Sequence, residues 1–164
     1  MDSVSSSSVD VEVAHDERRP PIKPTVDAVA VRLSRDFKPF DEDEYQRIVG
    51  LGGFVSLRDG GRVCDDLALT RALGDLHLSK YTAPVPHFHF EALAAGECPF
   101  FVIGCDGVWD ALTDQEAVDA VLQHSPTDLT TGATTLRDLA FLHGSTDNIS
   151  AIVVDLTRTL VAYA

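Results

Sequence analysis

The sequence predicts an α+β domain, because strand-like and helix-like segments follow one another along the chain. Two segments, 99–105 and 149–156, are almost continuously apolar, which is typical of buried strands. Between them, residues 113–122 and 128–142 carry apolar side chains at helical spacing. A length of 164 residues suits one such domain, or part of a larger one.

The first 27 residues have a different composition from the rest. They combine a serine run with acidic residues and three prolines, so we expect 1–27 to be a disordered acidic, Ser/Pro-rich tail. The domain is expected over 28–164. It opens with Val29, Val31 and Leu33 in alternation with other residues, which predicts a strand with one buried face.

A helix and a hairpin are predicted next. Asp41 can cap a helix, and Glu44 stands three residues later, where it would complete a capping box. Two short strands, 54–57 and 62–64, follow a group of glycines that ends the helix. The Asp-Gly-Gly sequence at 59–61 is a strong turn signal between them.

The later elements have clear boundaries. The strand over 99–105, apolar throughout, is expected to be buried on both faces and stops at Asp106. Thr113 and Glu116 form a second capping box at the start of the 113–122 helix. Gly144 lies just beyond the 128–142 helix, where a glycine commonly ends a helix.

Two acidic turns are attached to the two apolar strands. Asp106 follows the first strand, and Asp147 precedes the second. If the strands pair antiparallel, both carboxylates lie at one end of the pair and would attract a hard divalent ion such as Mg²⁺ or Mn²⁺. Gly107 would leave room for a backbone carbonyl or a water beside the ion. The alternative is that both aspartates merely cap turns.

Three segments, taken in order, carry a family resemblance. They read RVCDDLALTRALGD at 62–75, FVIGCDGVWD at 101–110 and GSTDNIS at 144–150, and the segments 36–39 and 52–55 fit the same register. Together they resemble the motifs of the metal-dependent Ser/Thr protein phosphatases of type 2C. The resemblance covers about 28–156, which corresponds to the later half of that family's catalytic domain.

The resemblance implies a fold and an activity. The fold is part of a β-sandwich of two antiparallel sheets flanked by helices, with a two-metal site for Mg²⁺ or Mn²⁺. The reaction is hydrolysis of phosphoserine and phosphothreonine in proteins. By motif, Asp106 and Asp147 would be metal ligands, Asp110 would lie near a weaker further ion, and Gly107 would contribute backbone at the site.

The first half of the family's site has no counterpart in this sequence. The family's Asp-Gly-His-Gly-Gly turn, Glu-Asp pair and phosphate-gripping arginine are not found. We therefore expect a truncated family member with little activity alone, and an apolar strand face that is exposed or covered in a dimer. The side chains expected on that face are Phe101, Val102, Ile103, Ile152 and Val153. The alternatives are a non-catalytic module that binds a phosphoprotein or partner domain, and a simple divalent-cation binder.

Other candidate residues have weaker support. His87 and His89 share a face of a weakly predicted strand over 87–93, and surface histidines are favoured over a metal pair. Cys105 is interpreted as a small buried residue rather than a nucleophile. Arg71 either meets acidic residues near the site or makes a surface pair.

Composition limits the partners and the cellular location that we expect for this protein. The net charge of −13 argues against nucleic acid or an anionic membrane as a partner. We expect no secretory signal, because the N-terminus has no basic start followed by an apolar core, and no apolar run reaches the ~20 residues that span a bilayer. Three cysteines suit reduced thiols, so a cytoplasmic protein is expected, with the nucleus as an alternative location.

Overall fold

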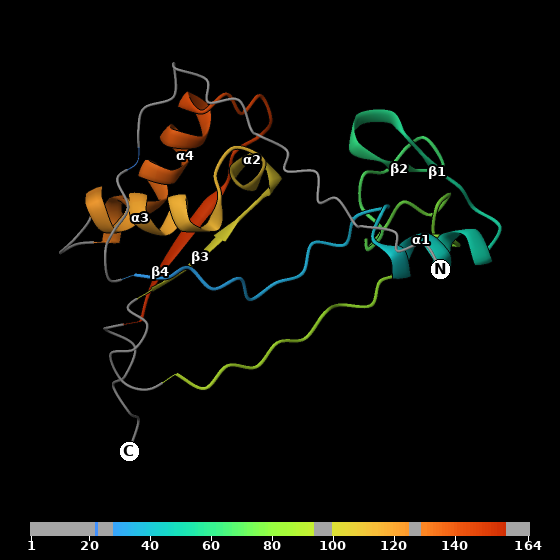
Figure 1. Cartoon of the computed structure of the whole chain (residues 1–164), viewed down its shortest axis with the longest axis horizontal. Coiled ribbons are helices and arrows are strands. Elements are labelled where there is room, and N and C mark those ends of the chain that lie inside the picture. The colour runs from blue at the N-terminus through green and yellow to red at the C-terminus, as the bar shows by residue number, and fades with distance from the viewer. Residues whose placement is uncertain (1–21, 23–27, 94–99, 125–128, 157–164) are drawn as a thin grey trace, which may run out of the picture. The chain divides into compact units, whose positions relative to one another are not determined.

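The computed structural model describes residues 22, 28–93, 100–124 and 129–156. The chain divides into two compact units, one over 32–92 (the α1 unit) and one formed by 1–31 with 93–164 (the β3–β4 unit). The described elements are α1 (Glu42–Gly50), β1 (Val55–Ser56), η1 (Arg58–Gly60), β2 (Arg62–Val63), β3 (Phe100–Gly104), α2 (Asp106–Trp109), α3 (Asp114–His124), η2 (Leu129–Thr131), α4 (Gly132–Leu142) and β4 (Ala151–Asp155) (Figure 1). Two antiparallel strand pairs with helices confirm the α+β class.

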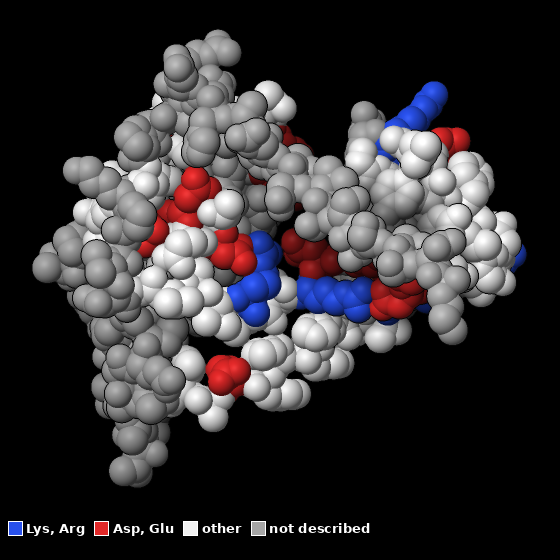
Figure 2. Space-filling model, viewed as in Figure 1, with Lys and Arg blue, Asp and Glu red and all other residues white. Residues whose placement is uncertain are grey.

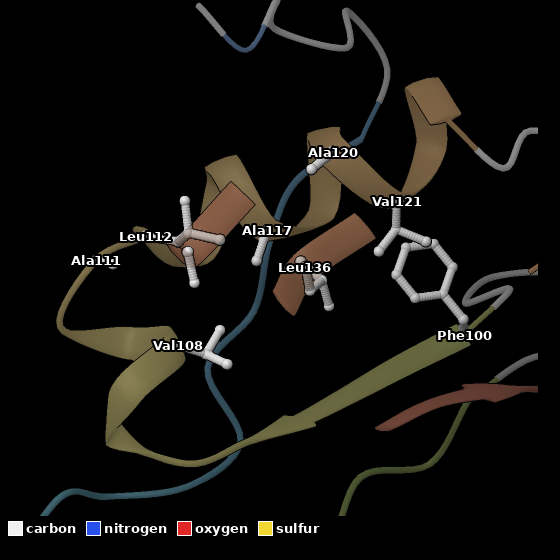
Figure 3. Close-up of a cluster of buried hydrophobic side chains, with 9 residues drawn as sticks. Phe100, Val108, Ala111, Leu112, Ala117, Ala120, Val121 and Leu136 are labelled. Atoms are coloured by element: carbon white, nitrogen blue, oxygen red, sulfur yellow. The ribbon is translucent and has the colours of Figure 1, made fainter. Parts of the chain in front are cut away.

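The β3–β4 unit is organised around its strand pair. The strands run antiparallel, with Phe100 opposite Asp155 and Gly104 opposite Ala151. On one face, Val102 and Val153 pack against a buried apolar cluster formed with the helices. Figure 3 shows this cluster drawing side chains from β3, α2, α3 and α4. Its buried members are Phe100, Val108, Ala111, Leu112, Ala117, Ala120, Val121, Leu136 and Ala140.

The opposite face of β3–β4 is not buried, so the prediction of a strand buried on both sides was wrong. Ile103 is 52% exposed and Ile152, its partner in register, is 57% exposed. Phe101 and Val154 form the next pair on this face and are partly buried. Within the described residues, the helices pack on only one side of the pair. The exposed apolar face was therefore predicted correctly at Ile103 and Ile152, whereas Val102 and Val153 lie on the core side.

The boundary residues of the two long helices act as their sequence predicts. Thr113 N–H donates to Glu116 Oε2 at 2.8 Å, and Glu116 N–H donates to Thr113 Oγ1 at 3.2 Å, which confirms the capping box of α3. Gly144 follows α4 with φ of +91°, a backbone conformation that favours glycine. The chain before α4 differs from the prediction: 129–131 form a 3-10 turn and 125–128 lie outside the described residues.

The α1 unit contains the predicted helix and hairpin. β1 and β2 pair antiparallel, with Val55 opposite Val63, as the turn signal at 59–61 predicted. The prediction of a capping box at the start of α1 was wrong, because Asp41 makes no side-chain hydrogen bond to the helix N-terminus. Asp41 Oδ2 accepts a hydrogen bond from Lys38 N–H at 3.2 Å, and Glu44 turns inward, where it is 1% exposed.

Two predicted strands are not formed. Residues 28–33 and 87–93 have no regular structure, and within the described chain neither segment has a partner strand. The backbone of 28–33 bonds elsewhere instead: Gln115 on α3 accepts from Ala30 N–H at 2.9 Å and donates to Ala28 O at 3.0 Å. An alternating pattern forms a strand only when a neighbour supplies the ladder.

The remaining predictions about the chain ends lie outside the described residues. Of the predicted tail over 1–27, only Ile22 is described, and it packs against the core cluster. None of the described helices has the length and apolar character needed to cross a lipid bilayer.

Candidate functional site

The pairing of β3 with β4 brings the two acidic turns together. Gly104 is the last residue of β3 and lies opposite Ala151, the first residue of β4. One step beyond this pair, Cys105 N–H donates to Ser150 O at 3.1 Å. The chain then continues into Asp106 on one side and arrives from Asp147 on the other, so both turns emerge at the same end of the strand pair.

Each aspartate is oriented by a neighbouring peptide group. Asp106 begins the short helix α2, and its Oδ1 accepts a hydrogen bond from Gly107 N–H at 3.0 Å. Asp147 Oδ1 accepts from Asn148 N–H at 2.6 Å. Both side chains are exposed. Within the described residues, the second oxygen of each carboxylate makes no hydrogen bond to protein, which leaves it available to a ligand.

Gly107 allows the two turns to approach closely. A Cβ atom placed on Gly107 would lie 2.3 Å from the carbonyl oxygen of Asn148, far inside van der Waals contact. The absence of a side chain on Gly107 therefore makes room for one specific backbone group. That group is the carbonyl of Asn148, the residue after Asp147.

Cys105 also connects the turns. Its thiol donates to Asn148 O at 3.0 Å and accepts a hydrogen bond from Ser150 N–H at 3.1 Å. The residue is partly buried at the N-terminus of α2 and is a free cysteine. It is therefore a hydrogen-bonded link in the site rather than a simple apolar filler.

Asp110 stands one helical turn after Asp106. Its N–H donates to Asp106 O at 2.8 Å, and its exposed side chain lies on the same side of the α2 turn because residues four apart share a helix face. The sequence expected a turn at 106–107, and the structure places a short helix there. This helix gives Asp110 a defined position relative to Asp106.

The donor set fits a hard divalent cation. Asp106, Asp147 and the nearby Asn148 carbonyl supply oxygen ligands, the type that Mg²⁺ and Mn²⁺ prefer. Three or more metal-binding side chains do not cluster anywhere in the described part of the chain. The Asp106 and Asp147 ligands expected from the sequence therefore remain a prediction, made from carboxylates that lie at one end of the strand pair.

A shallow groove of about 560 Å³ lies beside Asp147. Its walls come from the C-terminal half of α4, including Arg137 and the exposed Phe141, and from the turn at 147–149. Arg137 forms an exposed ion pair with Asp138 at 2.7 Å. The groove offers apolar and charged surface next to Asp147, one of the candidate metal ligands.

The histidine candidates lie away from these carboxylates along the chain. His87 and His89 are exposed in a segment without regular structure. The ring of His87 meets Phe37 edge-on at 6.5 Å between centroids, and His89 Nε2 lies 3.2 Å from Glu91 Oε2. Surface contacts therefore account for both residues, as favoured from the sequence.

Arg71 belongs to a buried ion-pair cluster in the α1 unit. It binds both carboxylate oxygens of Glu44, and its Nε donates to Glu44 Oε2 at 2.9 Å. Arg47 Nη2 donates to the same oxygen at 2.8 Å. Burial by itself would raise the pKa of Glu44, but hydrogen bonds from Arg47, Arg71 and Thr70 outweigh it and lower the pKa to about 2. Arg71 thus pairs with a buried acidic residue of its own unit and does not make a simple surface pair.

Other ion pairs of the α1 unit are exposed to solvent rather than buried. Arg35 Nη2 lies 2.6 Å from Asp43 Oδ1, and both side chains are largely exposed. Figure 2 shows basic and acidic side chains lying against one another on the visible face. Such exposed pairs contribute little to stability, in contrast to the buried Glu44 cluster.

Sequence reasoning missed the part played by Asn148. A backbone carbonyl carries no residue-specific signal, and its role depends on the Gly107 contact and the Cys105 thiol across the strand pair. The only available hint was glycine directly after Asp106.

Known proteins are similar to this chain in sequence, over a range that includes the two acidic turns. The family model described as protein phosphatase 2C matches residues 24–149, a range that includes both acidic turns. Protein phosphatase 2C homolog 1 of Schizosaccharomyces pombe is 43% identical over 133 residues, covering 80% of this chain and 37% of that protein. Probable protein phosphatase 2C 74 of Oryza sativa subsp. japonica is 40% identical over 134 residues, covering 80% and 33%. The chain thus spans about a third of the length of these curated relatives.

Solved structures share the fold. A phosphatase from a pathogenic strain of Toxoplasma gondii is 32% identical with a TM-score of 0.68, covering 76% of this chain and 41% of that chain. A sex-determining protein of C. elegans is 26% identical with a TM-score of 0.66, covering 75% and 31%. Because the family match extends over most of the sequence and both acidic turns, the chain belongs to the protein phosphatase 2C family.

Proposed function

We propose that this chain takes part in the metal-dependent hydrolysis of phosphoserine and phosphothreonine in proteins, with Mg²⁺ or Mn²⁺ as the ion. The observation that carries the proposal is the β3–β4 pairing, which places the turns of Asp106 and Asp147 at one end of the strands. Family membership supports the protein phosphatase class.

In this proposal the aspartates hold the ions. Asp106 and Asp147 would bind one ion through their free carboxylate oxygens, and Asp110 would help to bind a further, weaker one. A divalent cation bound there activates water and offsets charge on the phosphoryl group. Hydrogen bonds from Gly107 N–H and Asn148 N–H keep the two carboxylates oriented before any ion arrives.

The surroundings suit a protein substrate. The carboxylates are exposed, so a phosphorylated side chain on another protein can reach them. The groove beside Asp147 offers the flanking peptide an arginine, Arg137, and an apolar surface at Phe141. The acidic composition favours a phosphoprotein over nucleic acid or a membrane as partner, and the reduced thiols favour the cytoplasm or nucleus.

The test is phosphate release from a phosphothreonine peptide with and without Mn²⁺, alongside calorimetric titration of Mn²⁺ binding. The unchanged chain is compared with Asp106→Ala and with Glu42→Gln, which alters an exposed carboxylate on α1. We expect Mn²⁺ binding, with any Mn²⁺-dependent turnover abolished by Asp106→Ala and retained by Glu42→Gln. Mn²⁺ binding that is insensitive to Asp106→Ala would contradict the proposed ligand.

A second candidate function is a non-catalytic module that binds a phosphoprotein or a partner domain. The observation that favours it is the exposed pair Ile103 and Ile152, an apolar surface of the kind that partners cover. Mn²⁺-dependent binding of the phosphopeptide without phosphate release would identify this role. Mn²⁺ binding that is indifferent to the phosphopeptide would instead identify a simple cation binder.

A further inference from the structure

We propose that Cys105 is a positioning residue, whose thiol holds the Asn148 carbonyl and so sets the spacing between Asp106 and Asp147. The inference rests on the proposed metal-binding role of the two aspartates and adds a residue that acts through their backbone. Cys105 itself is not assigned to ligand binding or to chemistry.

The thiol is bonded on both sides. It donates to Asn148 O at 3.0 Å and accepts from Ser150 N–H at 3.1 Å, so it spans the turn that leads into β4. The backbone of Cys105 also donates to Ser150 O at 3.1 Å. Three hydrogen bonds therefore join this one residue to the chain that follows Asp147.

Asn148 transmits this connection to both carboxylates. Its N–H donates to Asp147 Oδ1 at 2.6 Å, and its carbonyl oxygen lies where a side chain on Gly107 would stand. The Gly107 N–H in turn donates to Asp106 Oδ1 at 3.0 Å. Gly107 and Asn148, whose N–H groups orient the two aspartates, are thus packed against each other, and the thiol holds Asn148 through its carbonyl, in the peptide group after the one that donates to Asp147.

An apolar residue at position 105 would occupy the space of the thiol without forming its hydrogen bonds to Asn148 and Ser150. Alanine at 105 would remove the donor to Asn148 O and the acceptor for Ser150 N–H. Serine occupies nearly the same volume as alanine and can both donate and accept. The pair of variants therefore separates hydrogen bonding from packing at this position.

The experiment is calorimetric titration of Mn²⁺ into the full chain and its variants. Groups that orient metal ligands typically contribute ~10- to 100-fold to metal affinity. We expect Cys105→Ala to weaken Mn²⁺ binding about 10-fold and Cys105→Ser to restore it to within about 3-fold of the unchanged chain. Cys64→Ala, which removes the free cysteine of the α1 unit, should leave the affinity unchanged.

Folding is checked for each variant by its thermal midpoint in circular dichroism. If Cys105→Ala does not fold, Cys105→Val takes its place as the apolar variant, because valine fills the space without a hydrogen-bonding group. Its Mn²⁺ affinity and thermal midpoint are then compared with those of Cys105→Ser. Weaker binding in the apolar variant at an unchanged midpoint, with rescue by serine, supports the positioning role.

The failures of this inference and of the proposed function can be told apart. Mn²⁺ affinity that is lost in Asp106→Ala but unchanged in the apolar Cys105 variant overturns the role of Cys105 alone. Equal weakening in the apolar and serine variants also overturns it, because hydrogen bonding is then not the cause. No Mn²⁺ binding by the unchanged chain overturns the metal site and this inference together.

Discussion

The absence of a side chain at Gly107 allows the two acidic turns to lie in contact. The Asn148 carbonyl oxygen occupies the position of a Cβ atom, at 2.3 Å, and this oxygen is part of the backbone. A side chain at this position cannot be accommodated by rotating a neighbouring group. The β3–α2 turn and the turn before β4 must therefore separate if Gly107 is replaced.

We expect Gly107→Ala to destabilise the β3–β4 unit by about 1–3 kcal/mol, the usual cost of overpacking a filled space. The same separation should weaken Mn²⁺ binding, since Asp106 and Asp147 lie on the two turns that are pushed apart. Urea unfolding followed by Trp109 fluorescence measures the first effect, because this tryptophan packs against the core of the unit.

Gly50→Ala is the matched control for this substitution. A Cβ atom on Gly50, at the end of α1, meets nothing within 4 Å, so the substitution should not destabilise the chain and can add up to about 1 kcal/mol, because alanine favours the helix more than glycine does. A Gly107→Ala chain as stable as the unchanged protein would show that the two turns are not held at this distance.

At the scale of elements, α1 is attached to the loop after β2 by buried charge. The Glu44 carboxylate, 1% exposed, accepts hydrogen bonds from Arg47 of the same helix and from Arg71. Arg47 also donates to Tyr81 O at 2.6 Å, and the Arg71 guanidinium lies 4.5 Å from the Phe37 ring centre. One buried carboxylate thus links four segments of the α1 unit.

We expect Glu44→Gln to destabilise the α1 unit by roughly 3–5 kcal/mol, because it leaves two arginines without their buried partner. The effect should depend on pH. The folded-state pKa of about 2 lies below the ordinary 4.5, so the ionised carboxylate stabilises the fold above about pH 4.5 and this contribution is lost as the pH falls toward 2. Urea unfolding monitored by tyrosine fluorescence at several pH values measures it.

The stability difference between the unchanged chain and Glu44→Gln should therefore stay constant from neutral pH down to about pH 4.5 and shrink below it. Asp43→Asn serves as the control, since its pair with Arg35 is exposed and contributes little. A difference that stays constant down to about pH 2 would mean that ionisation of Glu44 is not what stabilises the unit.

At the scale of the whole chain, the open face of β3–β4 is an apolar surface that the described helices leave uncovered. Ile103 and Ile152 are neighbours across the strands, and both are more than half exposed. Within the described residues, each strand of this pair also has one edge without a neighbouring strand. An apolar face with open edges is a typical surface for association with another chain.

We expect the chain to self-associate through this face, with a second copy covering Ile103 and Ile152. Sedimentation equilibrium should then give an average mass above the 17.7 kDa of one chain, rising with concentration. Ile103→Lys should lower the average mass toward that of the monomer, because a charge at the centre of the contact would be buried.

Phe141→Lys is the comparison variant, since Phe141 is a large apolar side chain that is 69% exposed on α4 rather than on the sheet. It should associate like the unchanged chain. A monomeric unchanged chain, or equal effects of the two substitutions, would rule out the sheet face as the contact.

The sequence alone determined the features that depend on neighbouring residues. The apolar strands at 100–104 and 151–155, the Thr113–Glu116 capping box and the hairpin around 59–61 all follow from local patterns. The order of the motifs was also sufficient to predict the family. The meeting of the Asp106 and Asp147 turns followed from one further assumption, that the two strands pair antiparallel.

Only the tertiary structure decided which distant groups meet. Glu44 has the spacing of a capping residue, but Arg71, 27 positions away, draws its carboxylate into the interior. The alternating residues at 28–33 lack a partner strand within the described chain, and Gln115 binds their backbone instead. The Asn148 carbonyl acquires its position from Gly107 and Cys105 across the strand pair. Hydrogen bonds and packing between distant segments carry no local periodicity, so they are settled only when the chain folds.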